Sequence, residues 1–315
     1  MKKWLVLTAL LMAMLVVLAG CATLDEKQRT WIFQPSDRSW SGAVSAAEGM
    51  EDVWIDFTPL QSQETARLHG LWLAADKPVA AATKMAKMAV ESQGPILLYL
   101  HGARYNVHGS APRIRRMQEL GFSVLAVDYR GFGKSTYQLP SENSAYEDAR
   151  IAWNWLAQQY PNRPRYIFGH SLGGPIAINL AAEVDDKRGT IVESTFTSIA
   201  DVVSSTRWGW MPVSLLITQR FEAVRKVSRI GSPLLVVHGG QDTLILPDLG
   251  RKLYEAAVEP KQFVLVEGGS HHNTNLVGQA QYRQALAQWL NISPSAEKVG
   301  TGSVIKYRSA SADTP

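Results

Sequence analysis

The strongest candidate for a reactive side chain is the serine in Gly169-His170-Ser171-Leu172-Gly173. A serine hydroxyl attacks a carbonyl carbon when a base takes its proton. Glycines two positions before and after the serine permit a tight turn that lifts the hydroxyl above its surroundings. The apolar run before the turn and the helical pattern after it place the serine at a helix start, where free N–H groups favour developing negative charge. Ser171 is therefore a candidate nucleophile.

A base and an acid that could assist this serine follow later in the chain. The strand predicted at 234–237 runs into His238-Gly239-Gly240-Gln241-Asp242, and the last predicted strand runs into Gly268-Gly269-Ser270-His271-His272. The carboxyl ends of parallel strands meet at one edge of a sheet, where ligands bind. A serine nucleophile needs a base, and the base needs an orienting acid. Ser171, Asp242 and His271 are therefore a candidate catalytic set.

The elements that must position these residues alternate between strands and helices. Several apolar runs are continuous, as in a sheet covered by helices on both faces. The predicted strands are 53–57, 68–73, 96–100, 123–127, 165–168, 190–192, 234–237 and 263–266, and the predicted helices are 111–120, 146–159, 172–184, 248–257 and 279–290. This order predicts an α/β fold with a doubly wound, mostly parallel sheet. Residues 198–230 interrupt the alternation and predict a small helical cap over the site.

The pattern at the N-terminus predicts a secretion signal followed by a lipid attachment site. Residues 1–20 combine Lys2 and Lys3 with an uncharged apolar run from Trp4 to Gly20. The following Leu18-Ala19-Gly20-Cys21 resembles the bacterial lipobox, in which the signal is cut before a cysteine that receives a lipid. Cys21 is the single cysteine of the chain, so it has no internal disulfide partner. An uncleaved membrane anchor is the alternative, but the apolar run is short for crossing a bilayer.

The remaining segments complete the expected layout. Residues 21–45 are polar and predict a lipid-anchored tether, 46–292 the folded domain, 77–92 a surface insertion and 293–315 a disordered tail. The lipid on Cys21 would make the membrane a partner and place the chain in a bacterial cell envelope. Ala22 is not aspartate, and in Gram-negative lipoproteins this favours the outer membrane.

Composition narrows the class of protein further. The 315 residues are 46% hydrophobic and 19% charged, which suits a globular domain. The formal net charge is +4, and loss of Lys2 and Lys3 with the signal would leave about +2, too little to indicate a nucleic-acid partner. Gly133-Lys134-Ser135 lacks the earlier glycine of a phosphate loop, because Asp128 stands there, and no metal-binding motif is present. We therefore expect neither a metal nor another cofactor.

Five motifs together resemble the α/β-hydrolase superfamily, nearest its serine-aminopeptidase-like or BEM46-like branch. They are His101-Gly102, Asp128-Tyr129-Arg130-Gly131-Phe132-Gly133-Lys134-Ser135, Gly169-His170-Ser171-Leu172-Gly173-Gly174, Asp242 and Gly269-Ser270-His271. The resemblance covers roughly residues 50–292. It implies that Ser171 is the nucleophile, His271 the general base and Asp242 its orienting acid. It also implies an oxyanion hole built from the backbone N–H groups of Ala103 and Leu172.

Some positions leave alternatives open. His272 is a second candidate base, and Glu193, at the end of a predicted strand, is a rival acid. Arg104 departs from relatives with Asn-Ala-Gly after His-Gly; its side chain narrows the acyl pocket, meets an anionic substrate group or faces solvent. Trp208 and Trp210 in the cap either bind an apolar acyl group or pack internally.

The expected activity is hydrolysis of an ester in a small-molecule acyl substrate, through an acyl-enzyme and without a cofactor. The same three residues serve serine peptidases, thioesterases and lipases, so these remain alternatives. A catalytically idle binding lipoprotein of the envelope is the alternative from another class. The complete Ser-Asp-His set argues against it.

Overall fold

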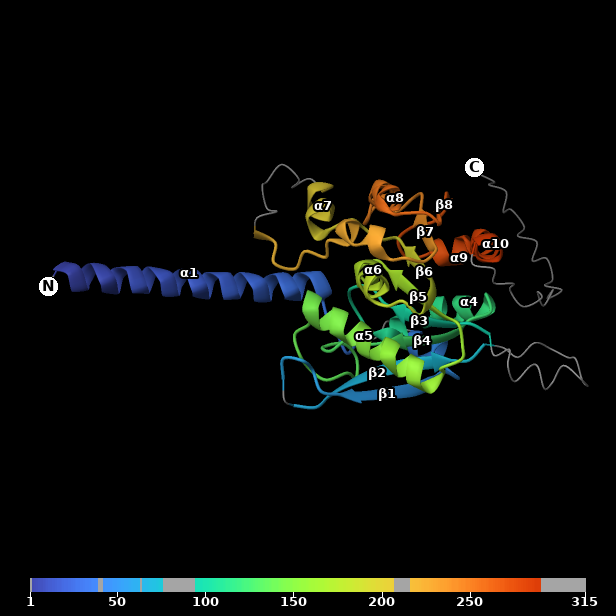
Figure 1. Ribbon diagram of the computed structural model, residues 1–315, viewed down its shortest axis with the longest axis horizontal. Coiled ribbons are helices and arrows are strands. Elements are labelled where there is room, and N and C mark those ends of the chain that lie inside the picture. The colour runs from blue at the N-terminus through green and yellow to red at the C-terminus, as the bar shows by residue number, and fades with distance from the viewer. Residues whose placement is uncertain (1, 39–41, 63, 76–93, 207–215, 290–315) are drawn as a thin grey trace, which may run out of the picture.

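The computed structural model describes residues 2–38, 42–62, 64–75, 94–206 and 216–289 (Figure 1). These residues form an eight-stranded sheet in the order β1-β2-β4-β3-β5-β6-β7-β8. The strands are β1 (Glu51–Phe57), β2 (Ala66–Leu73), β3 (Ile96–Leu100), β4 (Ser123–Val127), β5 (Arg165–His170), β6 (Lys187–Glu193), β7 (Leu234–Gly239) and β8 (Lys261–Val266). The pairs β1–β2 and β2–β4 are antiparallel and the other pairs are parallel. The predicted α/β fold with a mostly parallel sheet is confirmed.

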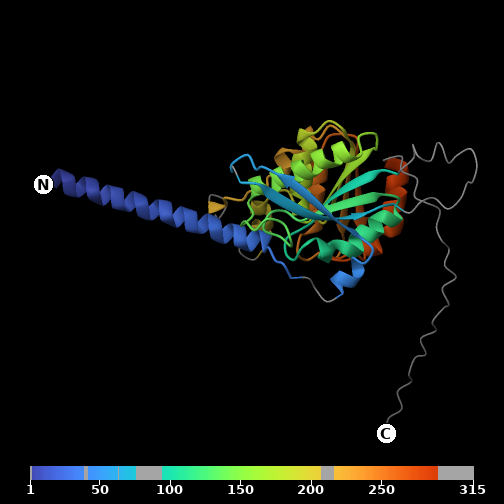
Figure 2. The ribbon, with the colours of Figure 1, turned by 90° about the horizontal axis from the view of Figure 1, so that it is seen from below.

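Helices flank this sheet on both sides (Figure 2). They are α2 (Ala43–Ala46), α4 (Ala111–Glu119), α5 (Glu142–Gln159), α6 (Gly173–Glu183), α8 (Pro247–Ala256), α9 (Thr274–Val277) and α10 (Gln279–Trp289). In β3, Leu98 and Leu100 pack in the cluster that includes residues of α5, α6 and α8, whereas Leu97 and Tyr99 pack in the cluster that includes residues of α4 and α10. Successive side chains of a strand point to opposite faces, so a strand covered on both faces is apolar throughout.

The segment between β6 and β7 holds short helical turns in place of a regular βα unit. Its described parts contain α7 (Ile199–Ser204) and two single-turn 3-10 helices, η3 (Ala223–Arg225) and η4 (Val227–Arg229). Phe221 is buried in the main hydrophobic cluster, so this side chain packs internally. Trp208 and Trp210 lie outside the described residues, as do the predicted insertion at 77–92 and the predicted tail at 293–315.

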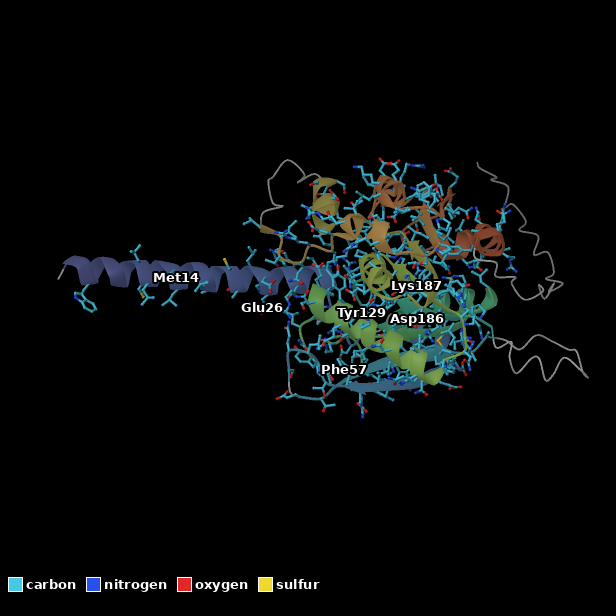
Figure 3. All side chains as sticks on the ribbon, viewed as in Figure 1. Met14, Glu26, Phe57, Tyr129, Asp186 and Lys187 are labelled. Carbon is cyan, nitrogen blue, oxygen red and sulfur yellow. The ribbon has the colours of Figure 1, made fainter. Side chains whose placement is uncertain are left out.

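The N-terminal helix α1 (Lys2–Phe33) includes the first part of residues 21–45, for which the sequence predicts a tether. Much of α1 projects away from the domain, as the position of Met14 shows, whereas Glu26 lies where the helix reaches the domain (Figure 3). Its last turns are polar enough to look like a linker, but their polar groups bond the domain: Arg29 donates to the carbonyl of Pro140 at 2.9 Å. Phe33 is fully buried. Among the residues that the structure describes, no helix has the length and apolar character needed to cross a membrane.

Candidate active site

The turn between β5 and α6 holds Ser171 in an unusual backbone conformation. Its φ is 54°, in the left-handed region that residues other than glycine seldom adopt. A Cβ on Gly169 would overlap the carbonyl oxygen of Gly173 and lie 2.7 Å from the Cβ of Ala177, so the glycine is needed there. The amide of Ser171 donates to the carbonyl of Glu193 at 3.0 Å, which ties the turn to β6. The sharp turn predicted from the sequence is thus present and strained, as at many functional sites.

The three residues of the candidate catalytic set meet at the carboxyl edge of the sheet. His271 Nδ1 lies 2.8 Å from Asp242 Oδ2, and His271 Nε2 lies 3.0 Å from Ser171 Oγ. A carboxylate accepts hydrogen bonds and does not donate them, so Nδ1 carries the proton and Nε2 is free to accept from the serine hydroxyl. This tautomer is the one that a general base for Ser171 requires.

Asp242 is held as a buried carboxylate. It is 3% exposed, and its Oδ1 accepts hydrogen bonds from the amides of Leu244 at 3.0 Å and Ile245 at 2.9 Å. Burial by itself would raise the pKa of Asp242, but hydrogen bonds from His238 and His271 hold that pKa well below its usual range. The side chain therefore stays ionised and keeps the imidazole of His271 oriented.

Two histidines that the sequence reasoning left without a role support this arrangement. His238 Nε2 donates to the carbonyl of Ile245 at 2.9 Å and lies 3.5 Å from Asp242 Oδ2, so it fixes the loop that carries the acid. His170 Nε2 donates to the carbonyl of His271 at 3.1 Å. Burial, together with the positive charge of Arg113, holds the pKa of His170 well below its ordinary value, so the ring remains neutral. In the sequence, only their positions pointed to these roles: His170 is next to Ser171, and His238 lies four residues before Asp242.

The rival residues are engaged elsewhere. His272 is exposed, and its carbonyl accepts a hydrogen bond from Arg113 Nη2 at 3.2 Å. The carboxylate of Glu193 pairs with Arg113 Nε at 2.8 Å and accepts the hydroxyl of Tyr282. Neither side chain occupies the position of His271 or Asp242. Arg113 on α4 thus links Glu193 on β6 to the backbone of the loop that carries His271.

The loop after β3 lies against the serine turn, as an oxyanion hole would require. A Cβ on Gly102 would lie 3.1 Å from the Cβ of Ser171. Among the described residues, the backbone N–H groups of Ala103 and Leu172 donate no hydrogen bond, so both donors are available. Arg104 is exposed, and its Nε donates to Gln34 Oε1 at 2.8 Å. The predicted roles of these residues towards a substrate stay predictions.

Two further predicted features concern cofactors and lipid. Within the described ranges, no group of three or more His, Cys, Asp or Glu side chains is arranged to hold a metal ion. Cys21 is exposed on α1 with a free thiol. Its lipidation is likewise still a prediction.

Comparison with known sequences supports an α/β-hydrolase. The sequence model of a family described as "Serine aminopeptidase, S33" matches residues 92–217. An uncharacterized protein of Mycobacterium tuberculosis (strain ATCC 25618 / H37Rv) is 32% identical over 199 residues, which are 62% of this chain and 70% of that protein. The lysophosphatidylserine lipase ABHD12 of Danio rerio is 32% identical over 212 residues, which are 61% of this chain but 54% of the lipase. The chain therefore matches about half the length of that lipase.

Solved structures share the fold at lower sequence identity. The esterase Pf2001 of Pyrococcus furiosus has a TM-score of 0.61 and 19% identity, covering 82% of this chain and 98% of the esterase. A puromycin-hydrolyzing peptidase of Mycobacterium tuberculosis has a TM-score of 0.57 and 18% identity, covering 78% of this chain and 40% of the peptidase. At such identities the likeness shows the architecture alone.

Proposed function

Because the chain belongs to the serine-aminopeptidase-like branch of the α/β-hydrolase superfamily, we propose that it is a serine hydrolase that cleaves an ester through an acyl-enzyme. The observation that carries this proposal is the position of His271, within hydrogen-bond distance of both Ser171 and Asp242. Serine, histidine and aspartate in this order of contact form the arrangement that activates a serine hydroxyl.

The proposed reaction has two steps. His271 Nε2 takes the proton of Ser171 as Oγ bonds to the carbonyl carbon, and the amides of Ala103 and Leu172 stabilise the oxyanion. The protonated His271 then donates to the leaving oxygen, so the alcohol departs and the acyl group stays on Ser171. Water, deprotonated by His271, releases the acid and restores the serine. Asp242 stabilises the positive imidazole throughout, and no cofactor takes part.

An ester is the preferred substrate among the bonds that such a site can cleave. Peptides and thioesters remain alternatives, since the same three residues serve all of them. A lipid ester is a specific second candidate, because a relative carries the name lysophosphatidylserine lipase. A membrane anchor on Cys21 would bring the site close to such a substrate.

A fluorophosphonate probe tests the nucleophile. We expect the wild-type chain to be labelled and Ser171→Ala to remain unlabelled, because phosphonylation requires the activated hydroxyl. Equal labelling of both proteins, or none of the wild type, would exclude the assignment. p-Nitrophenyl esters with short and long acyl chains, lysophospholipids and aminoacyl-p-nitroanilides then separate the esterase, lipase and peptidase alternatives.

We also propose that Cys21 is lipidated and holds the chain in a bacterial cell envelope. The support is the match of Leu18-Ala19-Gly20-Cys21 to the lipobox and the exposure of the cysteine. Cells fed a labelled fatty acid should label the wild-type chain and leave Cys21→Ser unlabelled. Label that persists in Cys21→Ser would refute attachment at this residue.

A further inference from the structure

The loop that carries the amide of Ala103 has an unfavourable backbone. Arg104 and Tyr105 follow Ala103 with φ values of 71° and 57°. The left-handed backbone conformation is unfavourable for residues other than glycine. Two such residues in a row keep it only when surrounding contacts hold them there. An oxyanion donor must point at the developing charge before the reaction begins, so whatever fixes this loop affects the rate.

The contacts that hold this loop come from the last residue of α1 and the segment that follows it. The amide of Arg104 donates to the carbonyl of Phe33 at 2.9 Å, and Pro35 pairs with Tyr105 in a parallel β-bridge. The side-chain amide of Asn106 donates to the carbonyls of residues 37 and 38 at 3.1 and 3.2 Å. These bonds, together with the contact between Arg104 Nε and Gln34 Oε1, reach the loop from one side.

The same segment is itself fixed to the domain. The ring of Phe33 is fully buried and packs edge-on against Phe132 at 6.4 Å and Phe221 at 5.7 Å between centroids. The amide of Gly133 donates to the carbonyl of Ser36 at 3.3 Å. A buried aromatic anchor with backbone bonds on either side makes residues 33–38 a rigid support.

We propose that residues 33–38 form a brace that positions the amide of Ala103 for the oxyanion. This inference rests on the proposed serine hydrolase function. The brace residues do not touch the reacting atoms; they act through the loop after β3. Because the brace is the direct continuation of α1, the segment by which the chain would be anchored ends against the active-site loop.

Phe33→Ala, Phe33→Leu and Gln34→Ala in the full chain test the brace. We expect Phe33→Ala to lower kcat for a p-nitrophenyl ester by about tenfold with little change in KM, because a displaced donor weakens the transition state and leaves substrate binding intact. Phe33→Leu and Gln34→Ala should have smaller effects. A trifluoromethyl ketone, which forms an oxyanion on the serine, should lose affinity in proportion to kcat/KM across the series.

A second readout does not depend on activity. Hydrogen exchange measured on peptides covering residues 101–106 should be faster in the Phe33 and Gln34 variants, while peptides from β3 exchange as in the wild type. Phe122→Leu is the control, because Phe122 is fully buried in the other hydrophobic cluster, at the amino end of β4. It should lower thermal stability without changing kcat, ketone affinity or exchange at 101–106.

The outcomes separate the brace from the proposed function. Unchanged exchange and unchanged kcat in all brace variants would overturn the brace, as would a fall in kcat that Phe122→Leu reproduces at equal loss of stability. A wild-type chain that neither hydrolyses esters nor takes the fluorophosphonate would overturn the proposed function. Exchange at residues 101–106 would still decide whether the segment holds the loop, and Phe33→Leu and Gln34→Ala keep the test open if Phe33→Ala fails to fold.

Discussion

Two histidines stand next to each other after β8, and their side chains have different surroundings. The ring of His271 is buried between Asp242 and Ser171, whereas His272 is exposed. Adjacent side chains on a loop point in different directions, so one of the two can serve as the base. The hydrogen bond from His170 to the carbonyl of His271 holds the backbone that carries the His271 ring.

Substitution of each histidine separates them. We expect His271→Ala to lower kcat for a p-nitrophenyl ester by about 10⁴-fold, because Ser171 then lacks a base. His272→Ala should stay within about threefold of the wild type, since its exposed ring packs edge-on against His271 at 5.2 Å while the bonds to Ser171 and Asp242 come from His271. Comparable losses in both variants would contradict the assignment of the base.

The residues of the site differed in how far the sequence revealed them. Ser171, Asp242 and His271 could be predicted as a group because each follows a strand, and parallel strands end at a common edge. His170 and His238 could not be assigned, because their roles are hydrogen bonds to loop carbonyls far away in sequence. No periodicity or spacing reports such a bond.

The turn from β5 to α6 depends on how closely its backbone approaches neighbouring elements. We expect Gly169→Ala to lower activity by on the order of 100-fold and the free energy of unfolding by about 2 kcal/mol, because the added methyl group overlaps Gly173 and Ala177. Gly268→Ala is the matched control, since its Cβ would meet only Val277 Cγ1 at 3.6 Å. The activity of both variants is measured by ester hydrolysis, and their free energy of unfolding by denaturant titration. A fully active Gly169→Ala would show that the turn tolerates the added volume.

His69 on β2 contacts two carboxylates, Asp52 on β1 and Asp128 directly after β4. Its Nε2 lies 2.5 Å from Asp52 Oδ1 and its Nδ1 lies 3.3 Å from Asp128 Oδ2; Lys134, His101 and His108 are the other titratable groups nearby. Burial alone would lower the pKa of His69, but hydrogen bonds to Asp128 and Asp52 raise it above 6.5. A raised pKa stabilises the fold most below pH 6.5, and this contribution is lost as the pH rises through the folded-state pKa.

The pH dependence of stability tests this link. We expect His69→Gln to lower the free energy of unfolding by about 2 kcal/mol at pH 6 and by clearly less at pH 9, measured by denaturant titration. Burial lowers the pKa of His108, so a protonated His108 disfavours the fold at low pH. His108→Gln should therefore lower the free energy of unfolding less at pH 6 than at pH 9. Equal losses from His69→Gln at both pH values would show that folding does not raise the pKa of His69.

The sheet was predictable to the extent that its strands are covered on both faces. Continuous apolar runs mark β3, β4, β5 and β7 in the sequence. The predicted strand at 190–192 lacks the start of β6, because Lys187 and Arg188 are polar although they belong to the strand. The order in which β2, β4 and β3 lie side by side is set by contacts between distant segments, which a single strand's pattern does not report.

The attachment of α1 to the domain is a property of the whole molecule that the local sequence conceals. Residues 22–33 look like a polar linker because the side chains that bond the domain are Asp25, Gln28 and Arg29. Gln219 Nε2 donates to Asp25 Oδ1 at 2.8 Å, and the amide of Thr218 donates to Gln28 Oε1 at 2.8 Å. These partners are about two hundred residues away in sequence. A docked helix and a tether therefore have similar composition and differ in their long-range bonds.

Limited proteolysis distinguishes the docked helix from a tether. Trypsin cuts extended chain, so in the native protein we expect cleavage after Lys27 to be at least on the order of 100-fold slower than in a peptide of residues 22–38. Gln219→Ala removes the bond to Asp25 without changing the cleavage site, and it should raise the rate after Lys27 by about tenfold if local opening of α1 limits cleavage. Mass spectrometry of the early fragments locates the cut. If the wild type is cleaved as fast as the free peptide, residues 22–33 detach from the domain in solution. This segment would then be a flexible linker to the domain.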